Sequence, residues 1–240
     1  SGFDIENTYH PFGDLKISKH DVGATGEYRS RRFNIRVDLT DVDGEVITDE
    51  CAYETTDGRA GTFTSGSSIS LAGDESATIL EVPENVRHSV SEDTPVGYTL
   101  SANGASGKIV ANSSNTCELL NKYEANGFVN LRATKTLSGR DLKRYQFRFE
   151  VRDQDGSLLR TAANKSDGSV VFGAIRYTQS DVGEHEYTIR EIVRDMAGYT
   201  FDERAYKAIV TVTDNGNGTL NVDARYEYAD GDSVDLPLFK

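Results

Sequence analysis

Two stretches, DLKISKHDVG at residues 14–23 and NLRATKTLSG at residues 130–139, decide how this sequence is organised. Both alternate apolar and polar residues, and each places three residues between a lysine and a glycine. Alternation of this kind is typical of a β-strand with one buried face. Because the two stretches begin similar patterns in the two halves of a 240-residue chain, they indicate an internal repeat of one strand-rich unit.

The rest of the chain keeps the same alternation, for example in FNIRVDL at 33–39 and FRFEV at 147–151. No stretch sustains a helical period beyond about two turns, although SGRDLKRYQ at 138–146 has room for one short helical turn. The sequence therefore predicts an all-β fold of two tandem Ig-like β-sandwich domains. We place the boundary in KYEANGF, near Ala125.

The predicted domains are residues 11–124 and 125–240, with residues 1–10 set apart as a terminal strand from a preceding repeat or a donor strand. With 39 acidic and 26 basic residues, the chain has a formal net charge of −13 and would repel nucleic acid and anionic membranes. It shows neither a membrane-spanning run nor a secretory signal segment. We therefore expect an intracellular protein or a trimmed piece of an exported one, without nucleic-acid or membrane contact.

Strand parity predicts that the lysines of the two opening stretches point inward, since side chains two positions apart share a face. Lys19 lies on the apolar face formed by Leu15 and Ile17, and Lys135 has the same place in the second copy. Lys16 points to the opposite face and is predicted to be solvated.

Each half also places a glutamate in an apolar strand shortly before Gly-Tyr. These are Glu92 in HSVSEDTPVGYTL at 88–100 and Glu191 in YTIREIVRDMAGYTF at 187–201, with Val193 expected on the face of Glu191. Asn121 is flanked on its own face by two apolar positions of CELLNKY at 117–123. A Lys, a Glu and an Asn in one core would be costly to bury separately, so their joint burial needs a chemical reason.

An intramolecular isopeptide bond is such a reason. Burial lowers the pKa of a lysine toward the neutral, nucleophilic amine and raises the pKa of a glutamate toward the neutral acid. The amine then attacks the asparagine carboxamide, while the protonated glutamate donates a hydrogen bond to the carboxamide oxygen, shuttles protons, and ammonia leaves. The alternative is an unreacted, hydrogen-bonded buried cluster. In either case the chain is not an enzyme acting on outside substrates, and no cofactor motif is present.

These residues resemble the isopeptide-forming Ig-like domains of Gram-positive pilins and adhesins, of the collagen-adhesin B-region type. The second half, from ATKTLSG through YTIREIVRDMAGYTF, resembles the streptococcal T-antigen pilin linkage domain along nearly its whole length. The first half is similar to a related repeat through LKISK, SEDTPVGY and LLNKY. The resemblance implies a bond from Lys19 to Asn121 assisted by Glu92.

The resemblance also implies a closing motif of an apolar residue, any residue and Asn, as in LLN at 119–121 and IEN at 5–7. The second half ends DLPLFK at 235–240, so the Asn expected for Lys135 and Glu191 would be the next residue. Residues 1–10 are either the tail of an upstream repeat or a donor strand. In the second case Asn7 would lie beside Lys135 of a neighbouring molecule in a head-to-tail assembly.

Other residues support no metal or enzyme site. DVDGE at 41–45 and DQDGS at 153–157 suggest calcium ligands but are read as hairpin turns, and the four histidines lack ligand spacing. Cys51 and Cys117 are read as buried free thiols, with a disulfide between them as the alternative.

The favoured function is that of an extracellular stalk or pilus-shaft module attached to the cell wall through other parts of the parent protein, with neighbouring repeats as partners. The alternative is an adhesive module that binds a host protein or glycan through loops such as TSGSSISLAGDES at 64–76. The host ligand is not predicted. Neither a pilin polymerisation motif of the Tyr-Pro-Lys-Asn type nor a Leu-Pro-x-Thr-Gly sorting signal is present, since DLPLFK has only the Leu-Pro, so pilin and single-chain adhesin stay open.

Overall fold

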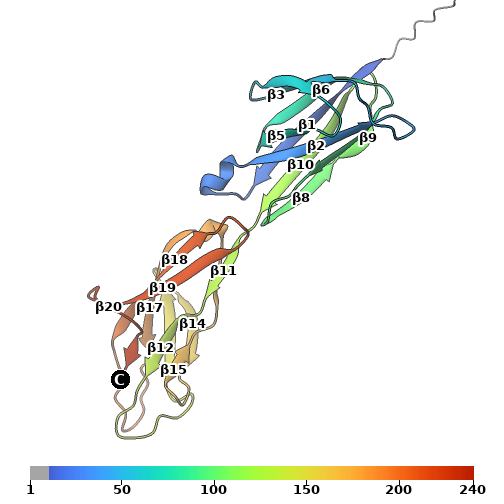
Figure 1. The fold of residues 1–240 in the computed structure, drawn as a ribbon. Helices are drawn as coiled ribbons and strands as arrows, with labels where there is room; N and C mark the ends of the chain where they lie inside the picture. The colour runs from blue at the N-terminus through green and yellow to red at the C-terminus, as the bar shows by residue number, and fades with distance from the viewer. Residues whose placement is uncertain (1–10) are drawn as a thin grey trace, which may run out of the picture. The chain divides into compact units, whose positions relative to one another are not determined.

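The computed structural model describes residues 11–240 and is built almost entirely of β-strands (Figure 1). The described residues form two compact units, unit 1 and unit 2, which divide between Glu124 and Ala125. Helical residues within 11–240 are confined to two short 3₁₀ turns, η1 (Gly26–Ser30) and η2 (Gln179–Asp181). The prediction of an all-β, Ig-like sandwich fold is confirmed. Within the described range no helix is long and apolar enough to cross a membrane.

Unit 1 contains a six-stranded sheet, in the order β4-β3-β6-β1-β10-β8, and a four-stranded sheet, in the order β5-β2-β7-β9. Its strands are β1 (Phe12–Val22), β2 (Arg32–Thr40), β3 (Cys51–Thr55), β4 (Ala60–Phe63), β5 (Ser68–Ala72), β6 (Ser76–Pro83), β7 (Arg87–Glu92), β8 (Tyr98–Asn103), β9 (Ser106–Lys108) and β10 (Ser114–Tyr123). Both sheets contribute alternate apolar residues to one core, as expected for a sandwich.

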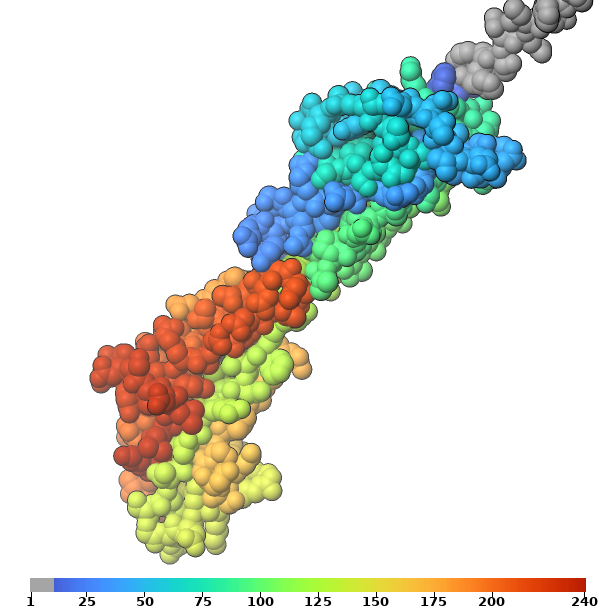
Figure 2. Space-filling view, in the orientation of Figure 1, coloured from blue at the N-terminus to red at the C-terminus, as the bar shows by residue number. Residues whose placement is uncertain are grey.

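Unit 2 has a six-stranded sheet, β14-β13-β17-β18-β19-β20, a three-stranded sheet, β15-β12-β21, and the pair β11-β16. Its strands are β11 (Asn126–Val129), β12 (Arg132–Lys135), β13 (Arg148–Asp153), β14 (Leu158–Ala163), β15 (Ser169–Val171), β16 (Ile175–Thr178), β17 (Gly183–Glu191), β18 (Ala205–Asp214), β19 (Leu220–Tyr228), β20 (Ser233–Val234) and β21 (Leu238–Phe239). The β18–β19 hairpin, red in Figure 2, lies beside β11, drawn in yellow-green.

In each unit the strand that carries the buried lysine pairs in parallel with the last strand, and this determines where the site lies. In unit 1, β1 is the central partner of both β6 and β10, and its alternation buries Leu15, Ile17 and Lys19 while Lys16 is exposed. In unit 2, β12 pairs in parallel with β21. The parity predictions for both lysines are therefore confirmed.

Some details differ from the sequence predictions. Residues 64–76 are not an exposed loop, because β5 runs through them and buries Ile69 and Leu71 in the core. Residues 138–146 form a loop with a turn at its end rather than a helical turn. Val193 is 57% exposed, since β17 ends at Glu191 and the alternation does not continue past it.

The two cysteines are buried free thiols, so the alternative of a disulfide is wrong for this structure. Cys51 lies on β3 and Cys117 on β10, with β6 and β1 between them in the sheet. Three strand spacings separate the two Cα atoms by roughly 14 Å, whereas a disulfide needs them within about 7 Å.

The two DxDG-type segments form matching turns. The Oδ1 atom of Asp41 accepts hydrogen bonds from the backbone N–H groups of Asp43 and Glu45, both at 2.9 Å. Asp153 does the same for the residues two and four positions after it, at 3.1 and 2.8 Å. Each leading aspartate is thus engaged in holding its turn.

Candidate functional site

The strand register brings Lys19 and Asn121 to neighbouring positions inside unit 1. In the parallel pair β1–β10, Lys19 is opposite Leu119 and Asp21 is opposite Asn121. Both Lys19 and Asn121 are 0% exposed. Their side chains therefore project from adjacent strands into the same core.

Glu92 reaches this pair from the facing sheet, where it is the last residue of β7. Its Oε2 lies 2.9 Å from Lys19 Nζ, and its Oε1 accepts a hydrogen bond of 2.6 Å from Asn121 Nδ2. The side chains of Lys19 and Glu92 are both 0% exposed. One buried carboxylate thus contacts both the amine and the carboxamide.

An aromatic ring supports the lysine. Lys19 Nζ lies 4.3 Å from the centre of the Phe33 ring on β2, a contact that stabilises a cation and also shields it from water. Ile35, two residues further along β2, is the cross-strand partner of Glu92. The β2–β7 pairing therefore places the ring and the carboxylate side by side beneath the lysine.

Burial sets the protonation chemistry of the cluster. Loss of water lowers the pKa of Lys19, although the hydrogen bond and charge of Glu92 and the charge of Asp21 act in the opposite direction. An amine that gives up its proton more easily than usual is a better nucleophile. The carboxylate beside it is placed to accept that proton.

Unit 2 repeats this arrangement atom for atom on the lysine side. Lys135 Nζ lies 2.9 Å from Glu191 Oε2 and 4.3 Å from the centre of the Phe147 ring, with Lys135 2% and Glu191 3% exposed. Phe149, two residues after the ring, is the cross-strand partner of Glu191. The Lys, Glu and Phe positions of the two units therefore correspond one to one.

The last strand of unit 2 differs from that of unit 1. Lys135 is opposite Phe239 in the parallel β12–β21 pair, and its Nζ donates a hydrogen bond of 3.2 Å to the backbone carbonyl of Lys240. In unit 1 the Asn121 carboxamide is two residues beyond the partner of the lysine. The register therefore assigns the role of Asn121 to the position that follows Lys240.

A buried acid holds this last strand in place. Asp202 accepts a hydrogen bond of 2.7 Å from the backbone N–H of Lys240, and its own backbone N–H donates one of 2.9 Å to Glu191 Oε2. Arg204 pairs with Asp202 at 2.6 Å and also donates to the Leu238 carbonyl at 2.9 Å. Burial would raise the pKa of Asp202, but these bonds outweigh it and hold the pKa at about 2.

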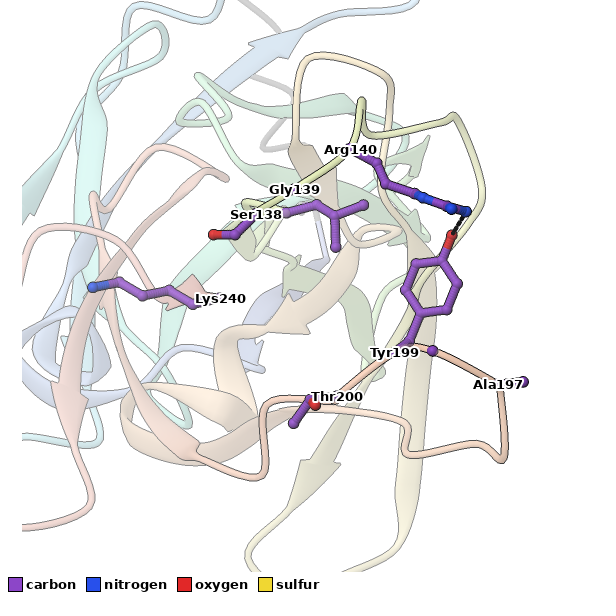
Figure 3. A pocket seen from close by; sticks show the side chains of 9 residues that line it. Ser138, Gly139, Arg140, Ala197, Tyr199, Thr200 and Lys240 are labelled. Atoms are coloured by element: carbon purple, nitrogen blue, oxygen red, sulfur yellow. Dashed lines mark hydrogen bonds between the residues drawn. The ribbon is translucent and has the colours of Figure 1, made fainter.

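Beside this strand lies a surface pocket lined by residues 137–140, residues 197–200 and Lys240 (Figure 3). Figure 3 shows Arg140 and Tyr199 meeting across it, with a hydrogen bond of 3.5 Å between the guanidinium and the phenol oxygen. The pocket therefore adjoins the place where the chain leaves β21.

The structure thus brings Lys19, Glu92 and Asn121 together, and pairs Lys135 with Glu191. The Asn121 carboxamide points its nitrogen, not its oxygen, toward Glu92, and its Oδ1 accepts no hydrogen bond from any described residue. This differs from the predicted hydrogen bond to the oxygen. Asn7 lies outside the described residues.

Sequence reasoning missed the supporting rings and Asp202. The two rings could have been found from the sequence, because Phe33 and Phe147 each lie two residues before the cross-strand partner of the buried glutamate. Asp202 has no such signal, since it lies in an irregular segment between β17 and β18 where no strand alternation indicates its direction.

Comparison with known families agrees with this division into units. Residues 131–239 match a family model described as a Spy0128-like isopeptide containing domain, and residues 13–123 match one described as a domain of unknown function. The resemblance of the chain to isopeptide-forming domains of pilins and adhesins is therefore confirmed. A search of curated proteins finds no match.

Solved structures, among them pilus adhesins, are also similar to the chain. The pilus-presented adhesin Spy0125 (Cpa) is 23% identical over 47% of this chain and 27% of its own, with a TM-score of 0.38. The Bacillus anthracis TIE protein is 16% identical over 82% and 31% of the two chains, with a TM-score of 0.30. The pilus adhesin SpaC from Lactobacillus rhamnosus GG is 15% identical over 94% and 25%, also at 0.30. The chain spans about a quarter of the length of the first adhesin structures it matches.

Proposed function

We propose that this chain is a stalk or shaft segment of a bacterial pilus or surface adhesin, in which unit 1 is locked by a self-catalysed bond between Lys19 and Asn121. The observation that carries the proposal is the contact of one buried carboxylate, Glu92, with both the amine at 2.9 Å and the carboxamide at 2.6 Å. The match of unit 2 to an isopeptide-containing family supports the same chemistry.

The reaction balances without a cofactor. Lys19 transfers a proton to Glu92, and its neutral Nζ attacks Cγ of Asn121 to form a tetrahedral intermediate. The carbon–nitrogen bond to Nδ2 breaks as that nitrogen receives a proton from the Glu92 carboxylic acid, and ammonia leaves. Nζ loses its second proton in this collapse, so the products are the amide, ammonia and one proton that leaves the site. Close packing of amine and amide in a dry core makes the reaction effectively unimolecular. It occurs once per chain, so the protein is not a turnover enzyme.

The position of the bond suits a protein under tension. Because β1 and β10 are parallel neighbours, a pull on the two ends of unit 1 loads the hydrogen bonds between them in shear. A covalent bond from Lys19 to Asn121 carries that load directly, and residues 20–120 fall outside the loaded path. We therefore propose an extracellular role, with attachment to the cell wall through other parts of the parent protein.

For unit 2 we propose the same bond from Lys135, assisted by Glu191, to an asparagine at the position that follows Lys240. The continuing chain would supply this residue, or a second copy would supply Asn7 in a head-to-tail assembly. The two sources differ on a denaturing gel, because only the second gives a ladder of covalent multimers. For the alternative of a host-binding module, the loop given as an example, residues 64–76, contains the core strand β5, so other surface loops would have to bind the host ligand.

Intact mass under denaturing, reducing conditions tests the proposal for unit 1. The native chain should be lighter than its sequence mass by about 17 Da, the mass of one ammonia. Lys19→Ala and Glu92→Ala should restore the full mass. Lys16→Ala, on the exposed face of the same strand, is the matched control and should keep the deficit. A native chain at full mass would overturn the proposal.

A further inference from the structure

A second buried carboxylate, Asp21, lies next to the unit 1 cluster with no visible structural task. Both of its carboxylate oxygens are buried, and neither has a hydrogen-bond partner among residues 11–240. Most buried polar atoms in folded proteins are paired, so an unpaired carboxylate calls for an explanation. It costs stability unless it serves the chemistry of its neighbours.

Its position on the strand directs it to the reacting groups. Asp21 is two residues beyond Lys19 on β1 and therefore shares its face. It is also the cross-strand partner of Asn121 in the β1–β10 register. Asp21 thus lies two residues after Lys19 on β1 and beside Asn121 on β10. Glu92 comes from the facing sheet.

Asp21 also borders solvent, unlike the cluster itself. It lines a surface pocket together with Gly23, Arg29, Gly73 and Asp74. A side chain at Gly73 would place its Cβ 2.9 Å from the Asp21 Cβ, so only glycine allows the β5–β6 turn to close over the carboxylate without a shift. The carboxylate therefore lies between the dry core and the pocket.

The proton balance of the cross-link gives such a group a task. An ammonium that becomes an amide nitrogen loses two protons, whereas the carboxamide nitrogen gains one to leave as ammonia. One proton must therefore leave the site, and Glu92, whose side chain is 0% exposed, has no contact with water. A carboxylate between Lys19 and the pocket can accept this proton and release it to solvent.

We propose that Asp21 is the proton relay of unit 1, which connects the Lys19–Glu92–Asn121 cluster with the pocket during cross-linking. This inference rests on the proposed function of that cluster. The relay accepts the second proton that Lys19 Nζ loses, after the first has gone to Glu92, passes it to water in the pocket, and marks the route by which ammonia leaves.

Charged groups on every neighbouring element act on Asp21. Burial raises its pKa, the charges of Lys19 on β1 and Arg31 after η1 lower it, and those of Glu92 on β7 and Asp74 in the β5–β6 turn raise it. The net effect raises the pKa of Asp21. A carboxyl group accepts and releases protons most readily when its pKa is close to the pH of the solution, and the rise brings Asp21 nearer to that condition.

The test follows the mass change of the newly synthesised full chain with time, in buffers of stepped pH, for wild type and variants. Asp21→Asn should slow the loss of about 17 Da by roughly tenfold to a hundredfold and shift the pH of half-maximal rate. Asp21→Glu should recover part of the rate. Asp43→Asn, at an exposed acid of unit 1 that neither lines the pocket nor acts on Asp21, is the control and should leave rate and pH profile unchanged.

The outcomes separate this inference from the proposed function. If wild type and Asp21→Asn cross-link at the same rate and with the same pH profile, the relay is overturned and the cross-link stands. If wild type never loses ammonia, both are overturned. A merely structural Asp21 predicts that its Asn variant is more stable and equally fast, so the unfolding midpoint of each variant is measured in parallel, which also detects misfolding.

Discussion

The two units bury the same lysine on the same kind of ring beside the same glutamate, yet they meet the last strand in different ways. In unit 1 the carboxamide of Asn121 completes the cluster, and in unit 2 the backbone carbonyl of Lys240 occupies that side of Lys135. The Lys–Glu–Phe contacts are the same in both units, whichever group of the last strand lies beside the lysine. The frame therefore belongs to the fold, whereas the proposed cross-link depends on the residue that the last strand supplies.

The largest difference should appear when each lysine is replaced by methionine. Lys19→Met removes a buried ion pair and, with it, the proposed cross-link, which closes a loop of about 100 residues and is worth about 5 kcal/mol of unfolding free energy. In the 240-residue chain, Lys135→Met removes the ion pair with Glu191, because the asparagine proposed at the position after Lys240 is not among these residues. Chemical denaturation of this chain that resolves the two units should show the greater loss for unit 1, and equal losses would contradict the Lys19–Asn121 bond.

The second largest effect should come from Asp202, the acid that binds the last strand of unit 2. Asp202→Ala leaves Arg204 and the N–H of Lys240 without their partner and should cost about 2 kcal/mol. Hydrogen exchange should show faster exchange of the Thr136 N–H, which is bonded to the Phe239 carbonyl. The exposed Asp195→Ala is the control and should change neither quantity.

Asp202 and Asp21 predict opposite responses of the two units to pH. The pKa of Asp202 is about 2 in the folded chain against 3.8 for the free group, so its contribution is present above pH 4 and is lost as pH falls toward 2. That contribution is about 2 kcal/mol of the stability of unit 2.

The pKa of Asp21 is raised, so unit 1 gains stability as Asp21 is protonated and loses it as pH rises through the folded pKa. Thermal unfolding at stepped acid pH checks both directions. Asp202→Asn should remove the acid loss from unit 2, and Asp21→Asn should remove the opposite trend from unit 1. Parallel pH curves for the two units would contradict the contrast.

The smallest effect should be the same in both units. Asp41→Ala and Asp153→Ala each remove two side-chain hydrogen bonds from equivalent turns and should each cost about 1 kcal/mol. Added calcium should shift neither unfolding midpoint. Stabilisation by calcium that is lost in either variant would show that the turn is a metal site instead.

Much of the site could be predicted from the sequence because strand geometry has a period of two. Alternation with Leu15 and Ile17 correctly predicts that Lys19 points into the core, and the same two-residue alternation correctly predicts that Asn121 does so. The two-residue alternation gives the wrong direction for Val193, because β17 has already ended at Glu191 and the residues beyond it are not in a strand. It also failed at residues 64–76, where a run of small polar residues concealed a core strand.

The sequence by itself determined the all-β class, the two units and the inward direction of each Lys, Glu and Asn, since these follow from local alternation and from the repeat. Tertiary structure alone decided that Glu92 reaches the pair from the facing sheet, that Asp202 fastens the last strand, and that Asp21 lies unpaired beside Asn121. Alternation specifies only the face of a strand to which a side chain belongs. Which side chains meet depends on the pairing of strands that are distant in sequence and on the packing of one sheet against the other.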